Sequence, residues 1–197
     1  YMDVDHFFLP ASAANLLDQE PLAALLAERS PAHLKHRLSG TAVAPKTLVA
    51  GDVVYQAECD GTTFLIEALG PAAGDDAAPL SLRISYGDFA MLVLSDLTLA
   101  QQKDFLARVP PEKLKADVVI APHHGTAGLE TITVGLPDDM DARLADATGA
   151  LLKATEAEAV VFEFGNPRPV VGLQYKEAVK IHGATRRAAE DALPQAL

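Results

Sequence analysis

Two adjacent histidines are the side chains whose type and setting best suit chemistry. His123 and His124 follow an apolar run and stand between Pro122 and Gly125. A loop that follows a buried strand and is flanked by proline and glycine often presents imidazole ligands to a metal. Adjacent residues on an extended loop point apart, however, and a structural histidine bonded to the backbone is the more common case. The residues alone leave metal binding and a structural role equally open.

Other metal-binding or nucleophilic side chains lack partners at the required spacing. His33 and His36 are three residues apart, which suits one face of a helix, but no third ligand lies near them in the sequence. Cys59 is the only cysteine, so it can form no internal disulfide. It precedes Asp60-Gly61, and we expect it at a hairpin tip without a nucleophilic role.

The elements that must position these residues follow from hydrophobic periodicity and turn residues. Seven strands are predicted, near residues 4–9, 52–57, 62–68, 80–86, 89–95, 117–121 and 159–164. Four helices are predicted, over residues 18–29, 98–108, 140–155 and 173–193. Strands in hairpins followed by alternating helices and strands predict an α/β (α+β) fold, with a layered sheet covered by helices. The 197 residues suit a single domain over residues 1–197.

Local signals support several of these elements. Asp60-Gly61 and Gly87-Asp88 are turn sequences between apolar runs, which indicates two hairpins. Thr98 and Gln101 fit a capping box at the start of the 98–108 helix. The run at 89–95 is almost wholly apolar, which predicts a central strand. Gly149 weakens the helix predicted around it.

The stretch from Leu80 to Thr126 resembles the second half of a metallo-β-lactamase domain of the ComEC competence-protein type. SLRISYGDFAMLVLSD matches the family's hairpin, and LKADVVIAPHHGT matches its strand opening into Pro-His-His-Gly-Ser/Thr. The resemblance extends upstream to Val4–Leu9 and downstream to Ala159–Asn166, so it covers most of the chain. It implies a metallo-β-lactamase-like layered sheet with helices outside. The family's first strands have no counterpart before Tyr1.

The family's principal metal motif is missing. That motif is His-x-Asp-x-Asp-His and directly follows the strand matched by Val4–Leu9. Its histidines fall at Ala11 and Leu16, and its aspartates fall at Ala13 and Asn15. Three aliphatic side chains and a neutral amide cannot bind a metal strongly.

The resemblance leaves three residues as metal ligands if any metal is bound. Asp96 matches the bridging aspartate of the family's Gly-Asp motif, and His123 and His124 match its histidine pair. The family usually has a histidine a few residues after Gly165-Asn166, and none stands there. Zinc or manganese would be the ion, although we expect no cofactor. A Ser-Asp pair at a strand-to-helix corner also suits helix capping or a turn, and we favour that role for Asp96.

Two function classes follow from the resemblance. The first, which we favour, is a degenerate, non-catalytic metallo-β-lactamase-like domain that serves as a structural or interaction module. The alternative is a metal-dependent hydrolase of the phosphodiesterase or nuclease type. In that case further ligands would come from unmatched positions or from a partner chain.

The net charge of the chain limits the classes of molecule that it is expected to bind. The formal net charge is -11, with 16 basic against 27 acidic residues. This argues against binding to nucleic acid or to anionic membranes, which needs a positive surface. The basic residues near His33–Arg37 and at Arg186-Arg187 are interpreted as solvated helix faces. A protein partner or a homo-oligomer fits the composition, and with no membrane span or signal peptide we expect a cytoplasmic location.

Overall fold

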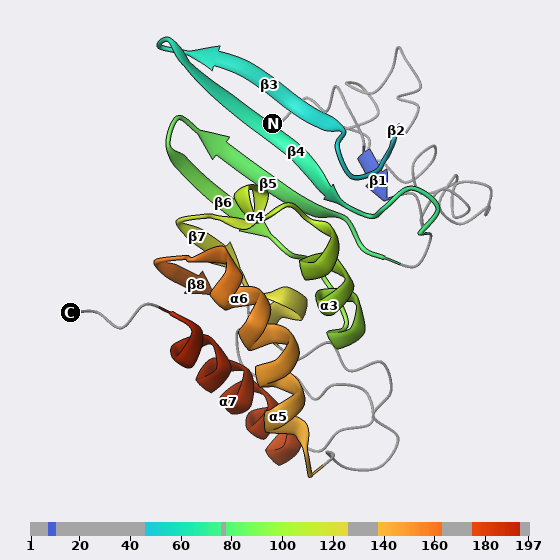
Figure 1. Ribbon diagram of the computed structural model, residues 1–197, viewed down its shortest axis with the longest axis vertical. Coiled ribbons are helices and arrows are strands. Elements are labelled where there is room, and N and C mark those ends of the chain that lie inside the picture. The colour runs from blue at the N-terminus through green and yellow to red at the C-terminus, as the bar shows by residue number, and fades with distance from the viewer. Residues whose placement is uncertain (1–7, 11–45, 76–77, 126–137, 163–174, 194–197) are drawn as a thin grey trace, which may run out of the picture.

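A computed structural model describes residues 8–10, 46–75, 78–125, 138–162 and 175–193 of the chain. Its main feature is a mixed six-stranded sheet in which the strands follow one another in sequence order. The strands are β3 (Val53–Cys59), β4 (Thr62–Gly70), β5 (Ser81–Tyr86), β6 (Phe89–Val93), β7 (Val118–Ile120) and β8 (Ala159–Val161). The strands from β3 to β6 pair antiparallel, whereas β6, β7 and β8 are parallel (Figure 1). The predicted α/β class is therefore confirmed.

The helices among the described residues lie in the second half of the chain. They are α3 (Leu99–Arg108), α4 (Pro111–Leu114), the 3-10 turn η2 (Pro122–Gly125), α5 (Met140–Leu144), the π-helical turn η3 (Ala145–Gly149), α6 (Ala150–Thr155) and α7 (Tyr175–Ala192). The predicted helix at 140–155 is thus present, with a π-helical turn in its middle. Among the described helices, none combines the length and apolar composition that a membrane span requires.

Residues with positive φ form the turns of the two hairpins. Asp60 and Gly61 both have positive φ, of 51° and 76°, which matches the right-handed twist of the flanking strands. Cys59 pairs with Thr62 as the last residue of β3, so it lies beside the tip rather than within it. Gly87 has a φ of 58° in the turn between β5 and β6. Both predicted hairpins are confirmed.

The start of α3 is fixed by the predicted capping box. The Thr98 hydroxyl accepts from the Gln101 N–H at 3.3 Å, and Gln101 Oε1 accepts from the Thr98 N–H at 3.0 Å. The helix ends before Pro110, and Pro111 then opens the short helix α4. The sequence predicted the end of α3 but not the start of α4. Proline stops one helix and also suits the first turn of the next, so the proline pair alone did not predict a second helix.

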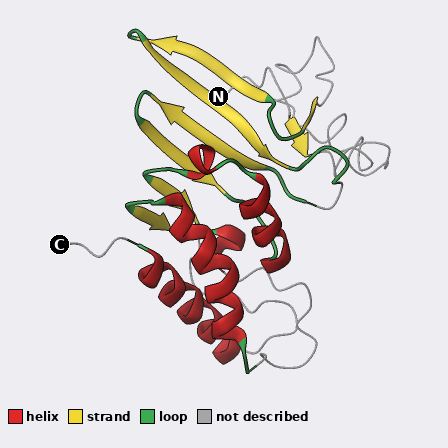
Figure 2. Cartoon of the chain, viewed as in Figure 1, coloured by secondary structure: helices red, strands yellow, loops and turns green. Residues whose placement is uncertain are grey.

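One face of the sheet packs against the helices and forms the core. Leu92 and Leu94 from the β6 segment and Val119 from β7 are buried against Phe105 of α3 and Leu151 of α6. Figures 1 and 2 show α3, α4 and α6 in front of the strands that carry these residues. The apolar run at 89–95 was predicted to be central, and β6 indeed lies between β5 and β7.

Charged side chains attach α4 to the same face of the sheet. Glu67 of β4 has a side chain only 10% exposed and pairs with Lys113 of α4. Arg83 of β5 donates hydrogen bonds to the carbonyls of Lys113 and Lys115. Burying these charges under the helix costs little free energy, because each of them has a partner.

The first predicted strand does not join the main sheet. Residues Phe8–Pro10 form β1, which pairs in parallel with β2 (Lys46–Leu48) as a separate two-stranded sheet. Of the strand predicted at 4–9, the described residues thus lie outside the six-stranded sheet. Gly51, with a φ of 96°, lies in the turn that separates β2 from β3. The helix predicted at 18–29 lies outside the described residues.

Candidate functional site

The site predicted around the histidine pair lies where two adjacent parallel strands end. Asp96 follows β6 in the turn before α3, and His123 and His124 follow β7 in η2. Since β6 and β7 are parallel neighbours, their carboxyl ends lie at the same edge of the sheet. This is the edge at which open α/β sheets usually place their binding residues.

Two of the three predicted residues meet there directly. His124 Nε2 lies 3.3 Å from Asp96 Oδ1, and the two side chains are 54% and 57% exposed. The His123 side chain is half-buried, and its backbone N–H donates to the Ser95 carbonyl at 2.7 Å. The hydrogen bond ties the two strand ends together and holds Asp96 and His124 in register.

The backbone at this edge is strained. Ser95, His123 and His124 have φ angles of 52°, 51° and 55°, and Gly125 continues the left-handed turn with a φ of 81°. A residue other than glycine in this region costs about 1–3 kcal/mol, and such residues cluster at functional sites. The expected extended loop is therefore wrong, because His123 and His124 form a tight left-handed turn. The His123–Ser95 hydrogen bond is one contact that holds it.

Of the two structural roles favoured together for Asp96, capping and turn formation, the structure gives the capping role to another residue. The N-cap of α3 is Thr98, which makes both capping hydrogen bonds with Gln101. Asp96 instead lies in the turn between β6 and α3 and faces His124. Asp96 is therefore a turn residue, which was the other half of the favoured prediction.

The donor set is small within the part of the chain that the structure describes. No group of three or more His, Cys, Asp and Glu side chains suited to a metal occurs among those residues. The positions of the lost motif, Ala11 to Leu16, lie outside them, as do His33, His36 and Gly165-Asn166. The described chemistry is therefore one carboxylate and one imidazole in contact, with a second imidazole adjacent in sequence.

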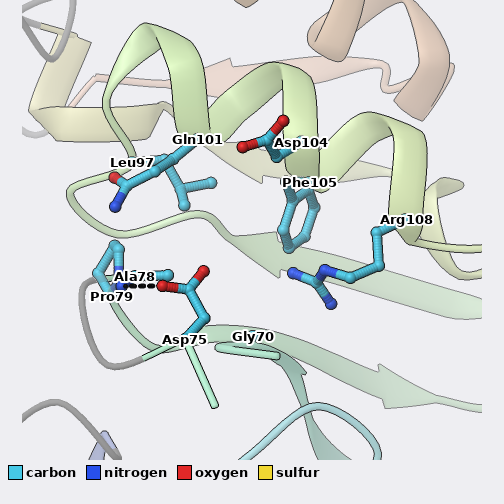
Figure 3. A pocket seen from close by; sticks show the side chains of 9 residues that line it. All are labelled: Gly70, Asp75, Ala78, Pro79, Leu97, Gln101, Asp104, Phe105 and Arg108. Carbon is cyan, nitrogen blue, oxygen red and sulfur yellow. Dashed lines mark hydrogen bonds between the residues drawn. The ribbon is translucent and has the colours of Figure 1, made fainter. Parts of the chain in front are cut away.

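A small cavity lies beside α3, away from this pair. Its volume is about 30 Å³, which leaves room for about one water molecule. Figure 3 shows Asp75 and Gly70 on one side and α3 on the other. Arg108 donates to the Leu69 carbonyl at 3.0 Å and lies 5.7 Å from the centre of the Phe105 ring. Binding sites for small molecules need roughly ten times this space, so the cavity is a packing feature.

The two arginines near the C-terminus form no basic patch. Arg186 pairs with Glu190 one turn along α7, and Arg187 pairs with Asp141 of α5. All four side chains are more than half exposed. The prediction that these arginines lie on a solvated helix face is confirmed.

No protein-family model, curated protein or solved structure matches this chain. Its function must therefore be inferred from its own residues and their arrangement.

Proposed function

We propose that the chain is a degenerate metallo-β-lactamase-like domain of the ComEC type that acts as a non-catalytic interaction module. The observation that carries this proposal is the size of the donor set at the strand ends. Asp96 and His124 face each other there, and among the described residues no third carboxylate, thiolate or imidazole completes a metal-binding group with them. A catalytic zinc usually needs three protein ligands and an open position for water.

The order of the elements supports the resemblance to this family. The β5–β6 hairpin, α3, β7 and the Pro122–Gly125 turn follow in the sequence that the family's second half has. The residues matched to the family's aspartate and to one of its histidines meet at 3.3 Å. Such a contact agrees with an ancestral metal site from which the other ligands have been lost.

The chemistry of the remaining pair explains why hydrolysis is not expected. An ion held by one carboxylate and one or two imidazoles keeps mostly water around it, and it acidifies that water less than an enclosed centre does. A second ion, which would stabilise a leaving oxygen, would need the aspartates that Ala13 and Asn15 replace. The acidic chain would also repel a polyanionic substrate.

A metal-dependent hydrolase is the second candidate, and the strained turn favours it. Left-handed His123 and His124 at a strand end are a costly arrangement of the kind found at working sites. In this case the missing ligands would come from positions that the family motif does not match, or from a partner chain. The substrate class implied by the family would be a phosphodiester.

An activity assay separates the two candidates. We expect the full chain, supplied with zinc or manganese, to show no turnover of a chromogenic phosphodiester or of single-stranded DNA above that of an Asp96→Ala/His124→Ala double variant. The reason is the shortage of ligands at the strand ends. Turnover that each single substitution abolishes would establish the hydrolase instead. Turnover that neither substitution changes would be assigned to a contaminant.

A further inference from the structure

Strand β3 forms one edge of the six-stranded sheet. It pairs with β4 on one side, and on its other side no described strand continues the ladder. Figure 1 shows β3 at the end of the sheet that is farthest from the helices. Its seven residues, from Val53 to Cys59, make it more than twice as long as the three-residue β8 at the opposite edge. An edge strand of this kind presents a row of backbone donors and acceptors with which another extended chain can pair.

The register identifies the residues of β3 whose backbone groups point outward. The Gly87 N–H donates to the Thr63 carbonyl at 3.5 Å, so the backbone groups of Thr63 face β5. Glu58 lies directly opposite Thr63, and two opposite residues of an antiparallel pair either bond to each other or both point away. The N–H and C=O groups of Glu58 therefore point away from β4. Because the direction alternates along a strand, those of Gln56 point outward as well.

The side chains around this edge are acidic. Glu58 and Asp60 are exposed, and Asp52 is half-buried just before the strand. None of these carboxylates forms an ion pair with a lysine or arginine among the described residues. No basic residue stands between Lys46 and Arg83 in the sequence. The edge therefore lies within a negatively charged part of the chain.

We propose that β3 binds an extended, basic segment of a partner protein, which adds to the sheet as a further strand. The inference rests on the proposed function as an interaction module and names the class of partner. Backbone hydrogen bonds to Gln56 and Glu58 hold the segment in register, as in other cases of strand addition. Lysine or arginine side chains of the segment pair with the carboxylates of Asp52, Glu58 and Asp60.

Charge selects a basic segment over a second copy of the chain. Acidic side chains on an edge strand oppose its pairing with another acidic strand. Two copies paired edge to edge through β3 would bring the carboxylates of both copies together, and each copy has a formal net charge of -11. A basic segment is attracted by the same carboxylates. Repulsion of one class of partner and attraction of another together give specificity.

Binding of a labelled peptide, followed by fluorescence anisotropy, tests the proposal. The probe is a short peptide in which lysine alternates with valine, so that it is both extended and basic. We expect the full chain to bind this peptide at least about tenfold more tightly than the same peptide with glutamate in place of lysine. Binding should weaken as the salt concentration rises, because the carboxylates at the edge are accessible to solvent.

Two pairs of variants separate the hydrogen bonds from the charges. Gln56→Pro removes an N–H that points outward and leaves the hydrogen bonds between β3 and β4 in place, and Gln56→Ala is its control. Glu58→Lys reverses a charge at the edge, and Asp88→Lys makes the same change in the exposed turn between β5 and β6. We expect Gln56→Pro and Glu58→Lys each to weaken binding at least about fivefold relative to its control.

Circular dichroism checks that each variant folds. If Gln56→Pro does not fold, a lysine–valine peptide with N-methylated amides takes its place in the test. That peptide keeps every charge but can donate no backbone hydrogen bond, so we expect it to bind at least about fivefold more weakly than the unmodified peptide.

Three results would overturn the proposal. One is a wild-type chain that binds the lysine peptide no more tightly than the glutamate peptide. Another is binding that neither Gln56→Pro nor N-methylation weakens, since charge alone would then hold the peptide. The third is self-association of the wild-type chain that Gln56→Pro abolishes, because a second copy would then occupy the edge.

Failure of this proposal is distinguishable from failure of the proposed function. None of the three results bears on the ligand shortage at Asp96 and His124. A chain without turnover that also ignores the peptide refutes only the strand addition, whereas metal-dependent turnover refutes the non-catalytic function whether or not the peptide binds.

Discussion

Replacing Phe105 by alanine should lower the free energy of unfolding by about 3–5 kcal/mol. Phe105 is 1% exposed and packs in the core between α3 and the sheet. Truncation removes the ring from this cluster and leaves a cavity that the sheet and α6 cannot close without moving. Since domains of this size are stable by about 5–15 kcal/mol in total, the loss is a large part of the whole.

Urea denaturation of the variant and of an exposed neighbour measures this effect. Asp104 precedes Phe105 in α3 and is exposed, so Asp104→Ala should change the unfolding free energy by no more than about 0.5 kcal/mol. If Phe105→Ala cost as little as Asp104→Ala, the packing of α3 against the sheet would be wrong. The turn that carries Asp96 leads directly into this helix, so the site geometry would then also be in doubt.

The second large effect concerns a buried polar network between α3 and the π-helical turn η3. Thr148 Oγ1 donates to Gln102 Oε1 at 2.7 Å, and Gln102 Nε2 donates to the Leu97 carbonyl at 2.9 Å. Both side chains are fully buried. Gln102→Leu and Thr148→Val should each cost about 1–3 kcal/mol, because each leaves a buried polar partner unsatisfied. The double variant should cost less than the sum, by about 1–2 kcal/mol, since the two substitutions remove both partners.

An exposed pair between the same two segments supplies the control. Lys103 of α3 pairs with Asp146 of η3, and their side chains are 52% and 70% exposed. A cycle of Lys103→Ala and Asp146→Ala should show a coupling of no more than about 1 kcal/mol, because solvent screens the pair. Equal coupling in the two cycles, measured by urea denaturation, would mean that the Gln102–Thr148 contact is not the buried network described above.

Local sequence signals predicted most of the main sheet and its helices. The Asp60-Gly61 turn, the Thr98 and Gln101 capping box and the apolar run of β6 each act over a few residues, so the sequence carries them directly. The pairing of β1 with β2 was not predicted, because it is not a local feature of the sequence. Lys46–Leu48 is a three-residue strand whose partner lies far away in the sequence, and no local pattern specifies such a pair.

The metal-binding role of Asp96, His123 and His124 stays a prediction, and the sequence did not predict the geometry around them. The resemblance grouped Asp96 with His124, and the structure places them in contact. Residue types did not predict the left-handed turn at His123 and His124. The only relevant preference is that histidine tolerates this conformation modestly well. The hydrogen bond from His123 to Ser95 joins two strand ends, so it depends on the assembled sheet.

An antiparallel hairpin with one solvated face should alternate between apolar and polar residues, but β6 is apolar on both faces. The run was interpreted as a central strand, which is correct. The described helices pack on the face that carries Leu92 and Val119.

The metal content of the full chain, purified without chelator, tests the central claim most directly. We propose that Asp96 and His124 remain from a metal site that no longer forms a catalytic centre. Mass spectrometry of the dialysed protein should find zinc and manganese well below one equivalent, with no difference between wild type and Asp96→Ala. One or more equivalents bound tightly by wild type and lost in both Asp96→Ala and His124→Ala would contradict the claim and establish a working metal centre.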